Sequence, residues 1–177
     1  MEIQPLAQQE FAEVASLLTA SFYPQIGWQS WFTPIFEMGI NHDLHSRLSH
    51  HSSSYSCLMG AHRPVSTSTT ATLIGTVEVA LKSLCSWSLF GMLVPYISNL
   101  AVDSRYRSQG IGRQLLLNCE PVVRQWGYDA LYLHVLENNT AARRLYASLG
   151  YQVQRKDSSL LTSLMAQPQR LLLYKQL

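Results

Sequence analysis

Glycines and arginines gather in the stretch RYRSQGIGRQLL, residues 105–116, where a short apolar run meets a helical pattern. The amides of a helix's first turn have no partner within the helix, and the helix dipole adds partial positive charge there. Gly110 and Gly112 would let anionic oxygens approach those amides, and Arg107 and Arg113 flank the turn. These residue types predict a phosphate or pyrophosphate site. A tight strand-to-helix turn without a ligand is the alternative.

Two common nucleotide-binding patterns do not fit this stretch. A Walker loop requires a lysine directly after its last glycine, and no lysine follows here. A dinucleotide fingerprint requires a third glycine three positions after the second, where this chain has Leu115. Both classes are therefore excluded.

A group of histidines in the segment NHDLHSRLSHH raises the question of a metal site. Its members are His42, His45, His50 and His51. The first two have the spacing of neighbours on a helix, but no further residues complete a ligand set. We expect a solvated helix face and no bound metal.

The composition indicates a folded protein and excludes several functional classes. Hydrophobic residues make up 47% of the 177 positions and charged residues 14%, which argues against disorder. The net charge of +2 and the lack of a basic block argue against a nucleic-acid partner. No uninterrupted apolar span suits a membrane. The three cysteines (Cys57, Cys85 and Cys119) show no C-x-x-C spacing, which favours a reducing compartment.

The first residues, MEIQPLAQQEFAEV, lack the features of a secretory or transit peptide. We expect a cytoplasmic protein of a bacterium or cyanobacterium, or a plastid stromal protein if a leader has been removed.

The apolar periodicity predicts the elements that position these residues. Helices are expected over residues 8–20, 28–51 (divided near Pro34 and Gly39), 109–127 (with a kink at Pro121) and 139–150. Strands are expected over residues 54–61, 72–81, 96–102, 130–136, 151–155 and 170–177. Residues 85–95 and 156–169 are expected to be connections. This order predicts one domain over residues 1–177 of the α/β (α+β) class, with a mixed sheet and helices on both faces.

Two linked motifs resemble those of the GCN5-related N-acetyltransferase (GNAT) family. YISNLAVDSRYRSQGIGRQLL resembles motif A, with [RQ]-x-x-G-x-[GA] read as Arg107, Gly110 and Gly112. NNTAARRLYASLGY resembles N-x-x-A-x-x-L-Y-x-x-x-G-[FY], read as Asn139, Ala142, Leu145, Tyr146, Gly150 and Tyr151. The resemblance covers residues 96–151, the expected acetyl-CoA-binding core. It implies a mostly antiparallel central sheet with a V-shaped splay.

The resemblance also implies where acetyl-CoA, the co-substrate, binds. Backbone groups of Leu100, Ala101 and Val102 would face the pantetheine arm and stabilise the oxyanion of the transfer step. The pyrophosphate would lie on Arg107, Ser108, Gln109, Gly110, Ile111, Gly112 and Arg113. Asn139, with Thr140 and Ala141, would bind the co-substrate near its pantetheine or thioester end. Tyr146 would protonate the leaving thiolate. An ordinary phenol pKa, near 10, is close to that of an alkyl thiol, so the proton transfer would be nearly balanced.

The acceptor amine must lose a proton, and three residues are candidates for the base. Tyr96 begins one expected strand, and His134 lies on another that neighbours it. The resemblance to eukaryotic N-terminal acetyltransferases implies that such a pair can share a proton-accepting water. His134 as a buried, hydrogen-bonded strand residue is nearly as plausible. Glu78 is the third candidate, although a solvent-facing strand position is the favoured interpretation for it.

The expected function is transfer of acetyl to a protein N-terminal α-amine or a lysine ε-amine by direct attack, without a covalent enzyme intermediate. The resemblance is strongest to the plastid and cyanobacterial branch that acetylates proteins. The expected partner is a peptide or protein acceptor, with no nucleic acid and no membrane, and the chain would be a monomer or homodimer. A small-molecule amine acetyltransferase and a catalytically silent acetyl-CoA-binding module are the alternatives.

Overall fold

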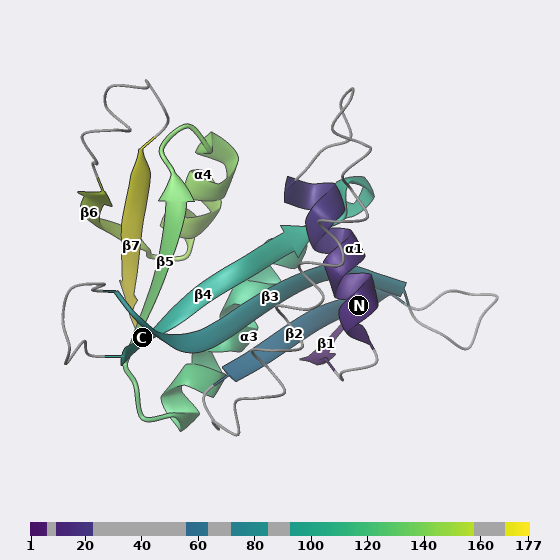
Figure 1. Ribbon diagram of the computed structural model, residues 1–177, viewed down its shortest axis with the longest axis horizontal. Coiled ribbons are helices and arrows are strands. Elements are labelled where there is room, and N and C mark those ends of the chain that lie inside the picture. Colours follow the sequence, from purple (N-terminus) through teal and green to yellow (C-terminus); the bar gives the residue numbers. More distant parts are fainter. Residues whose placement is uncertain (7–9, 23–55, 64–71, 85–92, 158–168) are drawn as a thin grey trace. The chain divides into compact units, whose positions relative to one another are not determined.

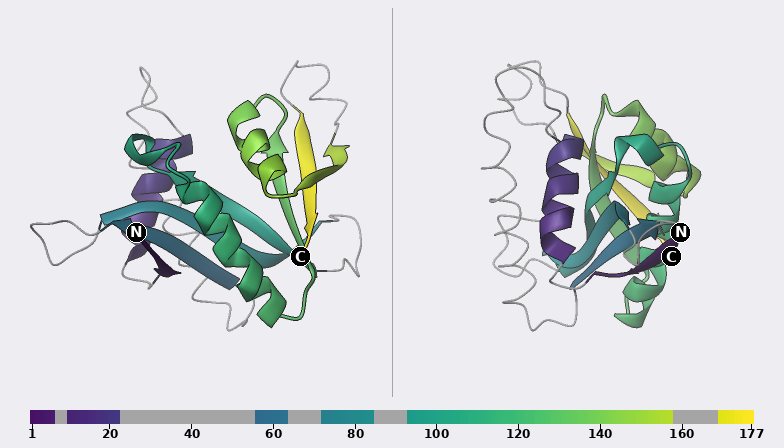
Figure 2. Two further views of the ribbon diagram at one scale, coloured as in Figure 1. Left: turned by 180° about the vertical axis from the view of Figure 1, so that it is seen from behind. Right: turned by 90° about the vertical axis from the view of Figure 1, so that its right-hand side faces the viewer.

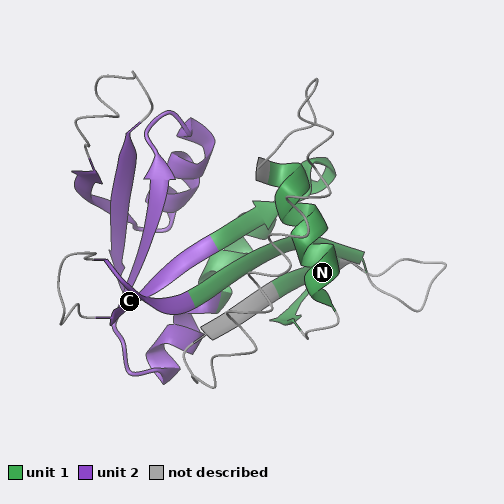
Figure 3. Cartoon of the chain, viewed as in Figure 1, with its two compact units in different colours: residues 1–79, 99–118 green, residues 80–98, 119–177 purple. Residues whose placement is uncertain are grey.

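The computed structural model describes residues 1–6, 10–22, 56–63, 72–84, 93–157 and 169–177. The helix expected over residues 28–51, with its histidines and aromatic residues, lies outside this part of the chain, as do Cys85 and most of both expected connections. The described chain forms two compact units (Figure 3). The first comprises residues 1–79 and 99–118, and the second comprises residues 80–98 and 119–177.

One seven-stranded sheet runs through the chain. Its strands are β1 (Glu2–Pro5), β2 (Ser56–Arg63), β3 (Thr72–Ser83), β4 (Leu93–Val102), β5 (Ala130–Leu136), β6 (Gln152–Asp157) and β7 (Arg170–Gln176). Their order in the sheet is β1-β2-β3-β4-β5-β7-β6. β4 and β5 pair in parallel, only at Tyr96 with Tyr132 and Ile97 with Leu133, whereas β5, β7 and β6 pair antiparallel. The mixed, mostly antiparallel sheet is confirmed, and the short parallel ladder is what the expected splay requires.

In the first unit, helix α1 (Phe11–Phe22) covers one face of the sheet and the start of helix α3 (Ile111–Gln125) covers the other (Figures 1 and 2). Four apolar residues of α1 form a buried cluster with strand residues: Phe11, Val14, Leu17 and Leu18 with Leu73 and Ala101. On β3, a Cβ added to Gly75 would lie 3.1 Å from side-chain atoms of Ile111 and Leu115. Glycine at this position therefore lets α3 approach the sheet closely.

In the second unit, β5 alternates buried and half-buried residues, and helix α4 (Thr140–Ser148) lies beside it (Figure 2). Leu131, Leu133 and Val135 are buried on one face, which leaves Tyr132 and His134 half-buried on the other. Residues 130–136 coincide with the predicted strand, which is therefore confirmed.

Several predicted boundaries are wrong. β1 was not expected, because four residues carry too little alternation to indicate a strand. β4 begins at Leu93, inside the expected connection, and α3 begins at Ile111, two residues later than predicted. α3 continues through Pro121 as one helix. β6 extends to Asp157, which the sequence assigned to a loop. Among the described residues, no helix is long and apolar enough to cross a membrane.

Candidate active site

The turn between β4 and α3 is held by its own side chains. The Asp103 amide donates to the Ile74 carbonyl at 3.0 Å, which fixes the end of β4 against β3. The Asp103 carboxylate accepts the Arg105 amide and two guanidinium bonds, at 3.1 and 2.7 Å. Arg107 Nε donates to the Val102 carbonyl at 3.1 Å. The turn is thereby shaped before any ligand binds, and part of the Arg107 guanidinium is used for it.

The start of α3 offers unpaired amides. Its first turn closes with the Gln114 amide donating to the Gly110 carbonyl at 3.0 Å, so the amides of residues 111–113 precede the first intrahelical bond. Gly110 has φ +81°, and a Cβ there would meet nothing within 4 Å. Ser108 has φ +61°, and both it and Gln109 are exposed. An open approach to a helix N-terminus fits a diphosphate.

The strand before this turn contains a local irregularity. Asn99 has φ +53°, a left-handed conformation that asparagine tolerates better than most residues. Its Nδ2 donates to Glu78 Oε2 at 2.7 Å, and Glu78 is 1% exposed. Our preferred interpretation of Glu78 as solvent-facing is therefore wrong. Beyond Asn99, Ala101 is buried against α1, whereas Leu100 and Val102 are half-buried.

In the second unit, Tyr96, His134 and Asp157 form a hydrogen-bonded chain. The Tyr96 hydroxyl lies 2.8 Å from His134 Nδ1, and His134 Nε2 lies 2.7 Å from Asp157 Oδ2. Burial lowers the pKa of His134 even though Asp157 opposes this, so the imidazole is neutral at neutral pH. Burial also raises the pKa of Tyr96, although the nearby Arg170 guanidinium acts to lower it. The sequence predicts that Tyr96 and His134 share a water or that His134 is a buried, hydrogen-bonded strand residue; in the structure the two side chains are in direct contact.

Tyr146 lies on α4, where it is 7% exposed and packs edge-on against Tyr151, with ring centroids 5.8 Å apart. Burial, and secondarily Tyr96, raises the pKa of Tyr146 to about 12. Our assumption of an ordinary phenol pKa near 10 is therefore wrong, because burial penalises the phenolate. Within the described part of the chain the Tyr146 hydroxyl has no hydrogen-bond partner. It is a weaker acid than expected, and it stays protonated.

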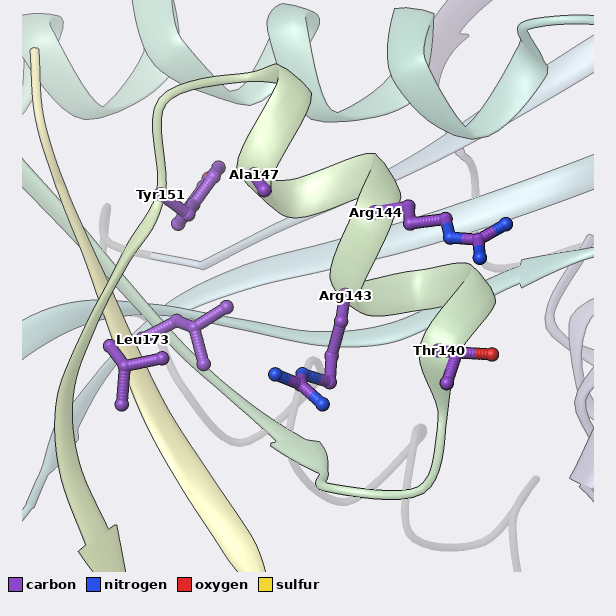
Figure 4. A pocket seen from close by; sticks show the side chains of 7 residues that line it. Thr140, Arg143, Arg144, Ala147, Tyr151 and Leu173 are labelled. Carbon is purple, nitrogen blue, oxygen red and sulfur yellow. The ribbon is translucent and has the colours of Figure 1, made fainter.

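The N-terminus of α4 places the second motif. Asn139 caps this helix, and its Oδ1 accepts the Ala142 amide at 3.1 Å. This use of the carbonyl leaves the side-chain NH2 group for another acceptor. Thr140 and Ala141 are exposed in the first turn. Thr140 also lines a pocket of about 350 Å³ that lies on α4 (Figure 4). Its remaining lining residues are Arg143, Arg144, Ala147, Tyr151, Val153 and Leu173.

Sequence reasoning missed the residues that surround the Tyr96–His134 pair. Asp157 was assigned to a loop, and its partner Arg155 (Nε to Oδ1, 2.8 Å) carried no motif signal. Lys82 lies 4.9 Å from the centroid of the Tyr96 ring and donates to Ser98 at 3.2 Å. Only a strand assignment extended to residue 157 could have indicated Asp157.

The candidate residues belong to both units. The turn of residues 105–113 and residues 99–102 lie in the first unit, and Tyr96, His134, Asn139 and Tyr146 lie in the second. Among the described residues, no group of histidine, cysteine and acidic side chains could hold a metal ion. The histidines of the proposed helix face lie outside those residues.

Comparisons with known proteins identify the family. The sequence profile of the Acetyltransferase (GNAT) family matches residues 26–151. GCN5-related N-acetyltransferase 10, chloroplastic, from Arabidopsis thaliana is 28% identical over 125 residues, covering 68% of this chain and 49% of the relative. The [Ribosomal protein bS18]-alanine N-acetyltransferase of Escherichia coli K12 is 43% identical over 53 residues, covering 30% of this chain and 36% of the relative. In both comparisons the chain spans less than half of the relative's length.

Solved structures of acetyltransferases share the fold of this chain. The PaiA N-acetyltransferase of Thermoplasma acidophilum, solved in complex with coenzyme A, superposes with a TM-score of 0.63. The two chains are 18% identical, and the superposition covers 99% of this chain and 98% of the other. At this identity the likeness shows a shared fold.

Proposed function

Because this chain belongs to the acetyltransferase (GNAT) family, we propose that it is an acetyl-CoA-dependent N-acetyltransferase that acts on amines of proteins. The acceptor is an N-terminal α-amine, a lysine ε-amine, or both. The observation that carries the proposal is the direct contact of Tyr96 with His134, because it supplies a neutral base beside a hydroxyl that can pass on a proton.

The first unit supplies the groups that bind acetyl-CoA. The free amides of residues 111–113 and the open approach at Gly110 suit the pyrophosphate, and Arg113 is exposed beside them. Leu100, Ala101 and Val102 follow the irregularity at Asn99, where the backbone can present amides to the pantetheine arm and to the thioester oxygen. Acetyl-CoA supplies an acetyl group activated as a thioester.

The second unit supplies the groups that move protons. The acceptor amine passes its proton to the Tyr96–His134 pair as its nitrogen forms the new bond to the acetyl carbon. Tyr146 donates a proton to the leaving thiolate, and its raised pKa keeps that proton in place at neutral pH. The side-chain NH2 group of Asn139 donates hydrogen bonds to acetyl-CoA.

The choice of a protein acceptor is supported by the name of one relative, and the choice of compartment by the names of two. The E. coli relative is named for alanine acetylation on a ribosomal protein, and the plant relative for its chloroplast location. We therefore propose that this chain acts in a bacterial cytoplasm or a plastid stroma. We further propose that residues 1–177 form one domain, because β3, β4 and α3 each pass from one unit into the other.

The decisive test is incubation of the full chain with acetyl-CoA and a peptide library in which each peptide has a free N-terminus and one lysine. Mass spectrometry of fragments separates α-acetyl from ε-acetyl products. A polyamine and an aminoglycoside serve as competing acceptors. Acetylated peptides support the proposal. Acetylation of the small amines alone would make this a small-molecule enzyme, and turnover of neither would make it a binding module.

Cofactor binding is tested separately by calorimetry. Gly112→Asp would place a carboxylate among the free amides at the start of α3, where it would repel the pyrophosphate. We expect this variant to lose acetyl-CoA binding, whereas the neutral control Gly112→Ala keeps more of it. Normal binding by Gly112→Asp would show that the pyrophosphate lies elsewhere.

A further inference from the structure

We propose that Asp157 is a positioning residue that selects the tautomer of His134, so that Tyr96, His134 and Asp157 act as one proton relay. The inference rests on the proposed function, since it assigns a third residue to the same proton-accepting group. The contacts that carry it are Tyr96 Oη to His134 Nδ1 at 2.8 Å and His134 Nε2 to Asp157 Oδ2 at 2.7 Å.

The direction of the two hydrogen bonds follows from what each group can donate. The pKa of Asp157 is lowered by hydrogen bonds from Arg155 and His134, so at neutral pH it is a carboxylate and can only accept. A neutral imidazole has one N–H, which must then sit on Nε2 and point to Asp157. Nδ1 is left with a lone pair, and the Tyr96 hydroxyl donates to it.

This arrangement makes Tyr96 a proton carrier. As the amine nitrogen attacks the acetyl carbon, the amine's proton moves to the Tyr96 oxygen. The proton of Tyr96 moves to His134 Nδ1, and the thiolate released by cleavage of the carbon–sulfur bond takes a proton from Tyr146. The imidazolium keeps its hydrogen bond to Asp157, which stabilises the charge. After the products leave, His134 releases its extra proton to solvent and Tyr146 takes one up, so that both groups return to their starting states. With the opposite tautomer Nδ1 would donate to Tyr96, and no lone pair would be available to receive its proton.

An irregularity in β6 places Asp157 for this contact. The pairing of β6 with β7 shifts by one residue between Val153 and Arg155, so that Arg155 pairs with Leu172 and Asp157 with Arg170. On the other side of β7, Leu172 pairs with His134. Paired residues share a face of the sheet, so the shift puts Asp157 on the face of His134. Without it, Lys156 would take the place opposite Arg170.

Other charged groups face the relay from neighbouring elements. Arg155 Nε binds Asp157 Oδ1 at 2.8 Å and fixes the carboxylate. Arg170 on β7 and Lys82 on β3 lie near Tyr96, and the charge of Tyr96 influences Tyr146 on α4. Arg155 and Arg170 disfavour a charged His134, whereas Asp157 favours it. Removing the Asp157 charge therefore lowers the pKa of His134 further.

The test compares Asp157→Asn with the control Glu137→Gln. Glu137 also forms an ion pair at this end of the sheet, with Lys156 at 2.8 Å, but it has no contact with His134. For Asp157→Asn we expect kcat to fall by about tenfold or more with an unchanged KM for acetyl-CoA, and the acidic limb of the pH profile to move to lower pH. Glu137→Gln should behave as the unchanged protein. In a His134→Gln background, Asp157→Asn should have no further effect.

Nitrogen-15 NMR of the His134 ring gives a readout that does not require turnover. We expect the proton on Nε2 in the unchanged protein and a shift toward Nδ1 in Asp157→Asn. A proton on Nδ1 in the unchanged protein overturns the proposal, as does an Asp157→Asn variant with the kinetics of Glu137→Gln. If the protein shows no acetyl transfer, the proposed function fails, and the NMR result still decides the tautomer.

Discussion

At the scale of single residues, Tyr146 combines a buried ring with a hydroxyl that no described residue binds. Because burial raises its pKa to about 12, this hydroxyl is protonated throughout the neutral range and can act only as a proton donor. We expect Tyr146→Phe to lower kcat by about tenfold or more while acetyl-CoA affinity changes little, since the ring packing on Tyr151 is kept. Steady-state kinetics measures kcat, and calorimetry measures the affinity for acetyl-CoA. Unchanged turnover would remove Tyr146 from the mechanism.

His134, also at the scale of single residues, makes the free energy of unfolding depend on pH. Its pKa in the folded protein lies below the ordinary 6.5, so just below that value the unfolded chain binds more protons than the folded one. The free energy of unfolding therefore falls as the pH drops through this window. The lowered pKa of Asp157 adds a loss below its ordinary 3.8.

We expect His134→Gln to flatten the first of these changes. Urea unfolding midpoints of the unchanged protein and the variant, measured between about pH 7 and about pH 5, give the comparison. Equal slopes in the two proteins would show that His134 is not desolvated in the fold.

At the scale of elements, helix α3 is flanked by a matched pair of glycines. Gly110 and Gly127 precede and follow the helix with φ of +81° and +82°, and a Cβ at either would meet nothing within 4 Å. Alanine at each position should therefore cost a similar amount, about 1–2 kcal/mol, from the left-handed backbone alone. Only Gly110→Ala should also weaken acetyl-CoA binding, because its methyl group enters the approach to the free amides. Denaturant unfolding and calorimetry measure the two effects, and an equal loss of affinity in Gly127→Ala would contradict the assignment.

The irregularity in β4 is a second element-scale feature. Asn99→Gly keeps a left-handed backbone accessible but removes one donor from the buried Glu78 carboxylate. We expect a loss of about 1–3 kcal/mol in the free energy of unfolding, measured in urea. The half-buried helix position Asn118, whose Nδ2 donates to the Gln114 carbonyl at 2.9 Å, is the control, and Asn118→Gly should cost about 1 kcal/mol or less. Equal losses would show that the Glu78 contact contributes little.

The sequence predicts the features of this fold that local interactions determine, but not those that depend on pairing between distant segments. Helices α3 and α4 and strand 130–136 were predictable because apolar spacing acts locally, and so do Asn139, which caps the start of α4, and Gly150, which follows its end. The position of Asp157 was not, because it depends on a one-residue register shift between β6 and β7 that no local pattern encodes. The contact of Glu78 with Asn99 was not predictable either, because it joins residues twenty-one positions apart in the chain.

At the scale of the whole molecule, acetyl-CoA should act as a stabilising ligand. A ligand that binds only the folded chain raises its stability by RT ln(1 + [L]/Kd). At about a hundredfold excess over Kd this is about 2.7 kcal/mol, or about 5–10 °C in Tm for a chain of this size. Thermal unfolding with increasing acetyl-CoA measures the shift. Gly112→Asp should show none of it, whereas Tyr146→Phe should keep nearly all of it, because the first variant removes binding and the second only a proton. Loss of the shift in both would place Tyr146 among the groups that bind the ligand, and a full shift in Gly112→Asp would exclude the start of α3 from the site.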